Sequence, residues 1–90
     1  MERTVQIDLS GVQASRELHE LLARSIGFPD YYGRNWDAFN ECIADPEIDL
    51  PDRIRLTGLG ALTEALPREA ALLKRCLAYP EVRPVVEWLT

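Results

Sequence analysis

The chain has 90 residues, of which 47% are hydrophobic and 28% charged. This length allows one domain with one modest hydrophobic core and excludes a second domain. The net charge of −5 is unevenly spread, because residues 30–52 hold seven acids against one base and so carry −6. Such a segment repels nucleic acid and attracts a cationic partner, unless it is simply a solvated charged surface.

The N-terminal residues and the cysteines indicate a cytoplasmic protein. The first ten residues, MERTVQIDLS, lack the apolar run of a signal peptide, and no stretch is apolar for the length of a membrane span. The two cysteines, Cys42 and Cys76, do not make a disulfide framework, and a single histidine argues against a zinc cluster. We therefore expect a cytoplasmic protein with thiol cysteines, no metal and no cofactor.

Alternating apolar residues predict a first strand over residues 4–9. A helix follows, with Ser15 as a possible cap and Gly27 at its end. His19 lies beside the apolar face of this helix, and we interpret it as a packing or surface residue rather than a catalytic one. The apolar face is formed by residues at i, i+3, i+4 and i+8, which are Leu18, Leu21, Leu22 and Ile26.

A second helix is predicted from about Trp36 to Asp45. Asn35 is a favoured N-cap, and Pro46 stops the helix. Gly33, just before the cap, can take a positive φ that a bulkier residue would resist. The helix therefore starts directly after a sharp turn.

The second half of the chain adds two strands and two helical segments. The pattern predicts strands over residues 53–58 and 85–89, a loop or short helix over 59–66, and a helix that starts at Pro67. Strands separated by helices imply crossovers and a mostly parallel sheet. We therefore predict an α/β domain with three strands and helices packed against them.

The second helix has one apolar side and one acidic side. Asp37, Glu41 and Asp45 follow each other at i, i+4 and i+8 and form a narrow stripe, with Asn40 on the border between stripe and core. Like charges at this spacing weaken a helix by roughly 0.2–0.5 kcal/mol per pair, so the stripe does not serve the helix itself. The apolar side consists of Trp36, Phe39, Cys42 and Ile43.

Three interpretations of the stripe are open. It keeps the surface hydrated, or arginines from elsewhere in the chain neutralise it, or it binds a partner. Tyr31 and Tyr32 precede the acids, and tyrosine is favoured at interfaces. Aromatic rings beside preorganised carboxylates can anchor arginine or lysine on a partner.

The segment YYGRNWDAFNEC, residues 31–42, resembles the signature of the barstar family, which are intracellular inhibitors of a secreted bacterial ribonuclease. The resemblance is specific from Glu17 to Ile43, which contain ELHELL, FPDYYG and a capped helix with D-x-x-x-E followed by cysteine. It implies a three-stranded parallel sheet packed with helices in one domain, residues 1–90. It also implies a ribonuclease plug without catalytic residues of its own.

Carried over by position, the resemblance implies a set of ribonuclease-binding residues in the second helix and the loop before it. Asp37 and Glu41 match the two helix acids, and Glu41 would mimic the RNA phosphate opposite the enzyme's arginines and catalytic histidine. The full set is Tyr31, Gly33, Asn35, Trp36, Asp37, Ala38, Asn40 and Glu41.

This chain departs from the family pattern near these positions. Glu41 stands where the family protein has aspartate, Asn40 where it has tryptophan, and Arg34 where it has an acid. Lys74 and Arg75 lie near the place of another acidic contact. These departures concern the partner rather than the fold, and they allow a different ribonuclease or a toxin that resembles one.

The leading hypothesis is a cytoplasmic inhibitor, or immunity protein, that binds a cationic ribonuclease or ribonuclease-like toxin as a monomer in a 1:1 complex. It would bind neither nucleic acid nor membrane. The main alternative is an interaction module of the same fold for a non-nuclease partner. An enzyme using Asp37 and Glu41 as acid and base ranks lower, because the chain lacks a phosphate loop, a nucleophile motif and a metal-ligand set.

Overall fold

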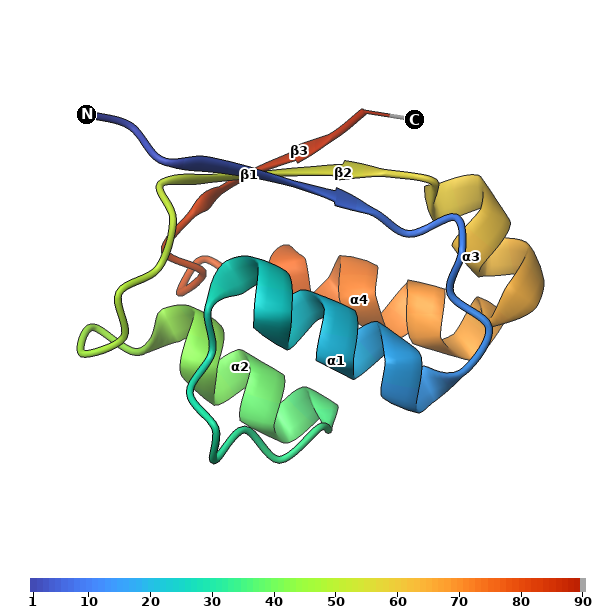
Figure 1. The fold of residues 1–90 in the computed structure, drawn as a ribbon, viewed down its shortest axis with the longest axis horizontal. Helices are drawn as coiled ribbons and strands as arrows, with labels where there is room; N and C mark the ends of the chain where they lie inside the picture. The colour runs from blue at the N-terminus through green and yellow to red at the C-terminus, as the bar shows by residue number, and fades with distance from the viewer. Residues whose placement is uncertain (90) are drawn as a thin grey trace.

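The computed structural model describes residues 1–89, and it shows one sheet with its helices packed against a single face (Figure 1). The strands have the order β1-β2-β3, and both neighbouring pairs are parallel. The predicted α/β class, with a three-stranded parallel sheet packed with helices, is confirmed. The elements in chain order are β1 (Thr4–Asp8), α1 (Ser15–Ile26), α2 (Trp36–Ala44), β2 (Arg53–Thr57), α3 (Leu59–Ala65), α4 (Pro67–Leu77) and β3 (Val85–Trp88).

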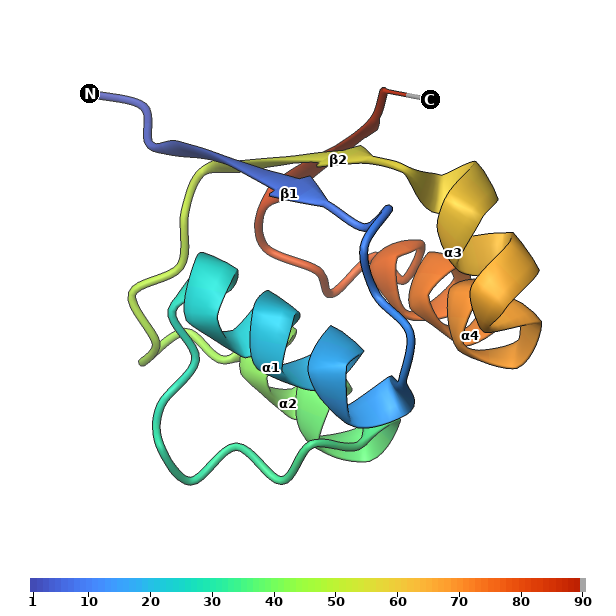
Figure 2. The ribbon, with the colours of Figure 1, turned by 45° about the vertical axis from the view of Figure 1, so that its right-hand side comes forward.

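The core lies between the sheet and helices α1, α2 and α4 (Figures 1 and 2). Because side chains alternate along a strand, β1 and β2 direct Ile7, Ile54 and Leu56 inward, and all three are buried. The helices supply the other wall, on which Leu18 and Leu22 of α1, Phe39 of α2 and Leu73 of α4 are each 0% exposed. The apolar faces predicted for the helices are therefore the ones that form the core.

The outer face of the sheet is mostly polar, with Val85 as an exposed apolar residue. Parallel sheets are usually covered on both faces, but here ion pairs occupy the uncovered side. Arg53 Nε lies 3.1 Å from Glu2 and its Nη1 lies 3.2 Å from Glu87, while Arg55 Nε lies 3.2 Å from the same Glu87 carboxylate. Charged side chains thus take the place of a second helical layer.

The two ends of α1 agree only in part with the sequence. Gly27 ends the helix at φ 93°, as predicted, and its N–H donates to Ala23 O. The prediction of Ser15 as the cap is wrong, because Ala14 is the N-cap and Ser15 is already helical. Glu17 takes over part of the capping by accepting the Gln13 backbone N–H at 3.0 Å.

Helix α2 begins as predicted but ends one residue early. Asn35 is the N-cap, and its Oδ1 accepts the Ala38 N–H at 2.7 Å. The helix ends at Ala44, with Asp45 as an extended C-cap at φ −73° and ψ 119°. As expected, α2 lies in the connection between β1 and β2.

The positive φ predicted for Gly33 occurs one residue later, at Arg34, with φ 53°. The reason is a small ring closed over Arg34, in which Asn35 Nδ2 donates to Gly33 O at 3.2 Å. A left-handed backbone costs a non-glycine residue roughly 1–2 kcal/mol. Gly33 serves close packing instead, since a Cβ there would lie 3.2 Å from Asn35 Nδ2.

Candidate binding surface

The two tyrosines before α2 point in opposite directions. Tyr31 is 77% exposed, whereas Tyr32 is only 7% exposed. The Tyr32 ring packs against Phe28 at a centroid distance of 5.0 Å. The interpretation of both rings as an exposed anchor is therefore wrong for Tyr32, which the loop inserts into the core, and Tyr31 alone faces outward.

A buried hydrogen bond fixes Tyr32 beneath the loop. Its hydroxyl lies 2.6 Å from His19 Nδ1 and 3.4 Å from the Asn35 carbonyl oxygen. His19 is buried, as the packing interpretation predicts, and its burial lowers the pKa of the imidazole, an effect that the charge of Glu69 opposes. Burial likewise raises the pKa of the Tyr32 hydroxyl. Both groups are therefore uncharged at neutral pH, and they tie α1 to the N-terminal end of α2.

The first two acids of α2 are exposed and unpaired. Within residues 1–89, no lysine or arginine nitrogen lies within 4.0 Å of the Asp37 or Glu41 carboxylate. The nearest base in sequence, Arg34, faces away from them and lies 3.8 Å from Glu20 of α1. Neutralisation by arginine ion pairs thus finds no support in the part of the chain that the structure describes.

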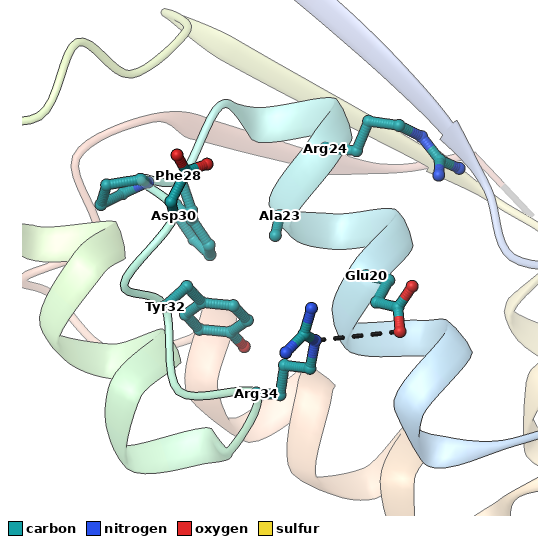
Figure 3. A pocket seen from close by; sticks show the side chains of 8 residues that line it. Glu20, Ala23, Arg24, Phe28, Asp30, Tyr32 and Arg34 are labelled. Atoms are coloured by element: carbon teal, nitrogen blue, oxygen red, sulfur yellow. Dashed lines mark ion pairs between the residues drawn. The ribbon is translucent and has the colours of Figure 1, made fainter.

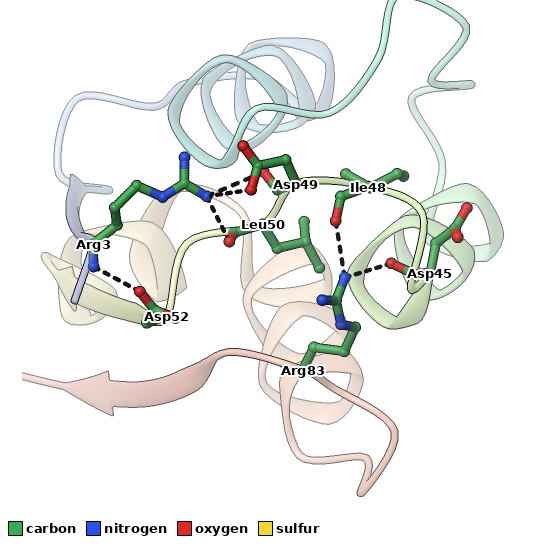
Figure 4. A network of polar contacts seen from close by, with 7 residues as sticks. All are labelled: Arg3, Asp45, Ile48, Asp49, Leu50, Asp52 and Arg83. Atoms are coloured by element: carbon green, nitrogen blue, oxygen red, sulfur yellow. Dashed lines mark hydrogen bonds and ion pairs between the residues drawn. The ribbon is translucent and has the colours of Figure 1, made fainter. Parts of the chain in front are cut away.

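The loop after α2 uses its acids differently (Figure 4). Arg3 lies 3.1 Å from the Asp49 carboxylate and donates to Leu50 O at 2.6 Å, while Asp52 accepts the Arg3 backbone N–H at 2.7 Å. These contacts attach the loop to the start of β1. The acidic segment over residues 30–52 therefore contains two parts, one that anchors a loop and one that stays free on α2.

A second arginine holds the start of the same loop. Arg83 donates to the carbonyl oxygens of Asp45 and Ile48 at 2.6 and 2.9 Å (Figure 4). The Asp45 carboxylate accepts the Glu47 N–H at 2.8 Å. The prediction of Asp45 as the third acid of a helical stripe is therefore wrong, because it lies beyond the helix and caps a turn.

The remaining predicted positions lie on α2 and in the turn before it. Gly33 and Asn35 are exposed in the turn, and Ala38 and Asn40 are half-buried on α2. Burial raises the pKa of the Cys76 thiol on α4, an effect that the Asn40 side chain opposes, while the buried Asn40 Oδ1 makes no hydrogen bond within the described chain. The structure thus brings all the predicted binding positions onto α2 and the turn that leads into it.

Trp36 differs from the other predicted positions because its polar atom is already bonded. The ring is half-buried, and Nε1–H donates to Glu69 Oε2 of α4 at 2.7 Å. The sequence gives no signal for this contact, because the two residues are 33 positions apart and Glu69 resembles any first-turn acid. Glu69 is therefore a residue of this surface that sequence reasoning missed.

A pocket of about 290 Å³ lies between α1 and the loop that carries Tyr31 (Figure 3). Its floor is aromatic and its rim has both signs of charge, so it favours neither a cation nor an anion. Arg34 reaches across it toward Glu20. The lining residues are Glu20, Ala23, Arg24, Phe28, Pro29, Asp30, Tyr32 and Arg34.

The described residues contain neither a metal-binding cluster nor a membrane-spanning helix. In residues 1–89, no group of three or more His, Cys, Asp or Glu side chains is placed to hold a metal ion. None of the helices described has the length and apolar character needed to cross a membrane.

Comparison with known proteins points to one family. The family model described as Barstar (barnase inhibitor) matches residues 2–83. No curated protein matches the chain. The matched span contains the exposed Tyr31, the capped start of α2 and both free acids, and it covers most of the 90 residues. The chain belongs to the barstar family.

Proposed function

We propose that this protein is a cytoplasmic, monomeric inhibitor of a cationic ribonuclease or ribonuclease-like toxin. One domain, residues 1–90, forms a 1:1 complex and blocks the enzyme with α2 and the preceding loop. The observation that carries the proposal is the pair of exposed, unpaired carboxylates, Asp37 and Glu41, on a capped helix. The family description as barnase inhibitors supports it.

The physical basis is mimicry of a phosphate by a fixed carboxylate. An arginine fork binds a carboxylate through two parallel hydrogen bonds, much as it binds a phosphate. Within residues 1–89, Asp37 and Glu41 have no ion pair to break before they bind, and the Asn35 cap holds the start of their helix. Glu41 takes the phosphate position, opposite the enzyme's arginines, and Asp37 lies one helical turn nearer the loop.

The other predicted binding residues would add contacts around the two acids. Tyr31 offers an exposed ring that buries apolar area at little cost in entropy. Gly33, Asn35 and Ala38 present a backbone that a partner can approach closely, and Asn40 borders the acids on the α4 side. Trp36 is half-buried and bonded to Glu69, so it would present only part of its ring to a partner.

The test is titration of the protein into RNA-cleavage assays with small basic ribonucleases, including any that the same organism secretes. We expect stoichiometric loss of cleavage by the cognate enzyme. Asp37→Asn and Glu41→Gln should each weaken inhibition at least tenfold, since truncating a desolvated charge contact costs about 2 kcal/mol or more. Glu47→Gln is the matched control, because it removes the same charge from the loop outside α2 and should leave inhibition within about threefold of wild type.

Full cleavage by every ribonuclease at excess folded protein would argue against inhibition. It would favour the alternative, an interaction module of the same fold for a non-nuclease partner. That alternative has one specific observation in its favour: Lys74 and Arg75 on α4 are exposed and, within the described chain, pair with no acid. Capture of an unrelated protein, lost in Asp37→Asn, would then identify the partner.

A further inference from the structure

Trp36, in the first turn of α2, contacts residues of two other helices. This residue stands between the cap Asn35 and the acid Asp37. Its Nε1–H donates to the Glu69 carboxylate at 2.7 Å, and its ring centroid lies 4.5 Å from that of His19 and 5.4 Å from that of Phe39. Helices α1 and α4 thus both contact the residue on which the helix starts.

The acceptor of the Trp36 hydrogen bond is the carboxylate of Glu69. Glu69 is half-buried, and within residues 1–89 it forms no ion pair. A solvated acid in the first turn of α4 would suffice to complement the helix dipole. Such an acid does not require a short hydrogen bond to an indole of another helix. The interaction with the helix dipole therefore explains why an acid stands at position 69, but it does not explain the hydrogen bond from Trp36 to that acid.

Helix α2 needs such external support. It has nine residues, and isolated helices shorter than about 12 residues are marginal in water. Its N-terminal end is joined to the preceding loop by the Asn35 cap and by the Tyr32 hydroxyl near the Asn35 carbonyl oxygen. Neither contact reaches α4, so the Trp36–Glu69 hydrogen bond is the polar link that fixes this end relative to α4.

We propose that Glu69 is a positioning residue for the α2 surface. Acting through Trp36, it fixes the direction of the first turn and hence the place of Asp37 relative to Tyr31. A charge-assisted hydrogen bond suits this task, since it is shorter and stronger than a neutral one and constrains direction. The inference gives Trp36 a supporting role in place of the contact role predicted from the sequence. The expected effect of Glu69 on the affinity for a ribonuclease rests on the proposed function. The expected effect of Glu69 on the first turn of α2 in the free protein does not.

The first experiment uses the free protein and compares Glu69→Leu with Glu69→Gln. Glutamine keeps an acceptor for the indole N–H but removes the charge, so it separates the hydrogen bond from the helix dipole. Amide hydrogen exchange is measured by NMR at Ala38 and Phe39 in the first turn and at Ile54 and Leu56 in β2. The indole N–H signal of Trp36 is followed as well, with Trp88 as the internal reference.

We expect Glu69→Leu to speed exchange at Ala38 and Phe39 about tenfold while exchange in β2 stays at the wild-type rate. The Trp36 indole signal should shift, and Glu69→Gln should restore most of the protection. Unchanged exchange at the first turn would overturn the proposal. An equal increase in β2 would also overturn it, because that result describes general destabilisation rather than loss of position.

The second experiment uses a ribonuclease that the wild-type protein inhibits. Glu69→Leu should raise Kd about tenfold, Glu69→Gln much less, and the Glu69→Leu change should have little further effect in a Trp36→Phe background. Glu64→Leu, an exposed acid on α3, is the control and should be neutral. Loss of inhibition in Asp37→Asn with an unaltered Kd in Glu69→Leu would sink the positioning role and leave the inhibitor intact.

Discussion

Tyr32 and His19 form a polar contact inside an otherwise apolar core. His19 is 2% exposed, and its Nδ1 lies 2.6 Å from the Tyr32 hydroxyl. A buried polar group that loses its hydrogen bond costs about 1–3 kcal/mol, so each residue requires the other. This requirement fixes which of the two neighbouring tyrosines enters the core, and it leaves Tyr31 free for a partner.

Because the His19 imidazole is buried, we expect stability to fall in mildly acidic solution. Burial lowers the pKa of His19 below its ordinary value of 6.5, so below pH 6.5 the unfolded chain binds a proton that the folded chain resists. The free energy of unfolding should therefore decrease as pH falls below 6.5, with a slope of at most about 1.4 kcal/mol per pH unit.

Urea unfolding between pH 7.5 and pH 5.5 measures this slope. His19 is the chain's single histidine, so the variant His19→Gln should lose most of the slope in this interval, whatever its stability at pH 7.5. Identical slopes in both proteins would show that His19 accepts a proton in the folded state as easily as in the unfolded chain.

At the scale of elements, the loop from Asp45 to Asp52 depends on an arginine near the end of the chain. Arg83 binds two of its carbonyl oxygens, Asp45 O and Ile48 O, just before β3 begins. Replacement of Arg83 by alanine should lower the free energy of unfolding by about 1 kcal/mol, the net value of an ordinary hydrogen bond at an exposed site. A glutamate-specific protease should also cleave after Glu47 faster than in wild type.

The matched control for this prediction is Arg68→Ala. Arg68 is exposed on α4 and, in residues 1–89, takes part in no ion pair. Its loss should leave both stability and cleavage near the wild-type values. Equal effects of the two substitutions would mean that the loop is held by its own packing.

The elements that follow local rules were predictable from the sequence. The Asn35 cap, the Gly27 end of α1 and the Pro67 start of α4 each depend on the conformation of one residue and its near neighbours. The alternation in the strands and the leucine spacing in α1 likewise give the faces that become buried. The three strands and four helices of residues 1–89, and their order, therefore follow closely from the pattern.

The details of the candidate surface depend on tertiary contacts and were not predictable. Nothing local distinguishes Tyr31 from Tyr32, because the choice is made by His19 on another helix. The left-handed residue is Arg34 rather than Gly33, because the Asn35 side chain closes back on the Gly33 carbonyl. Glu69 reaches Trp36 only after α2 and α4 have packed together.

At the scale of the whole molecule, the proposed function implies that charge governs how fast the protein meets a cationic ribonuclease. The loop acids are held by Arg3 and yet remain exposed, so they still contribute to the negative field around α2. We expect the association rate to fall roughly tenfold or more as salt is raised, while dissociation changes little. Stopped-flow measurements at several ionic strengths test this expectation. An association rate that does not change with salt would show that long-range charge attraction does not steer the two proteins together.

The position of α2 within the β1–β2 crossover has a consequence for synthesis on the ribosome. The strands on either side of α2 pair with each other, Thr4 with Arg53, and so the helix cannot take its place before β2 has been made. Glu69 and Arg83, which hold its start and the loop after it, are made later still. Nearly the whole chain must therefore leave the ribosome before the acidic surface exists, and a truncated product would offer none of it.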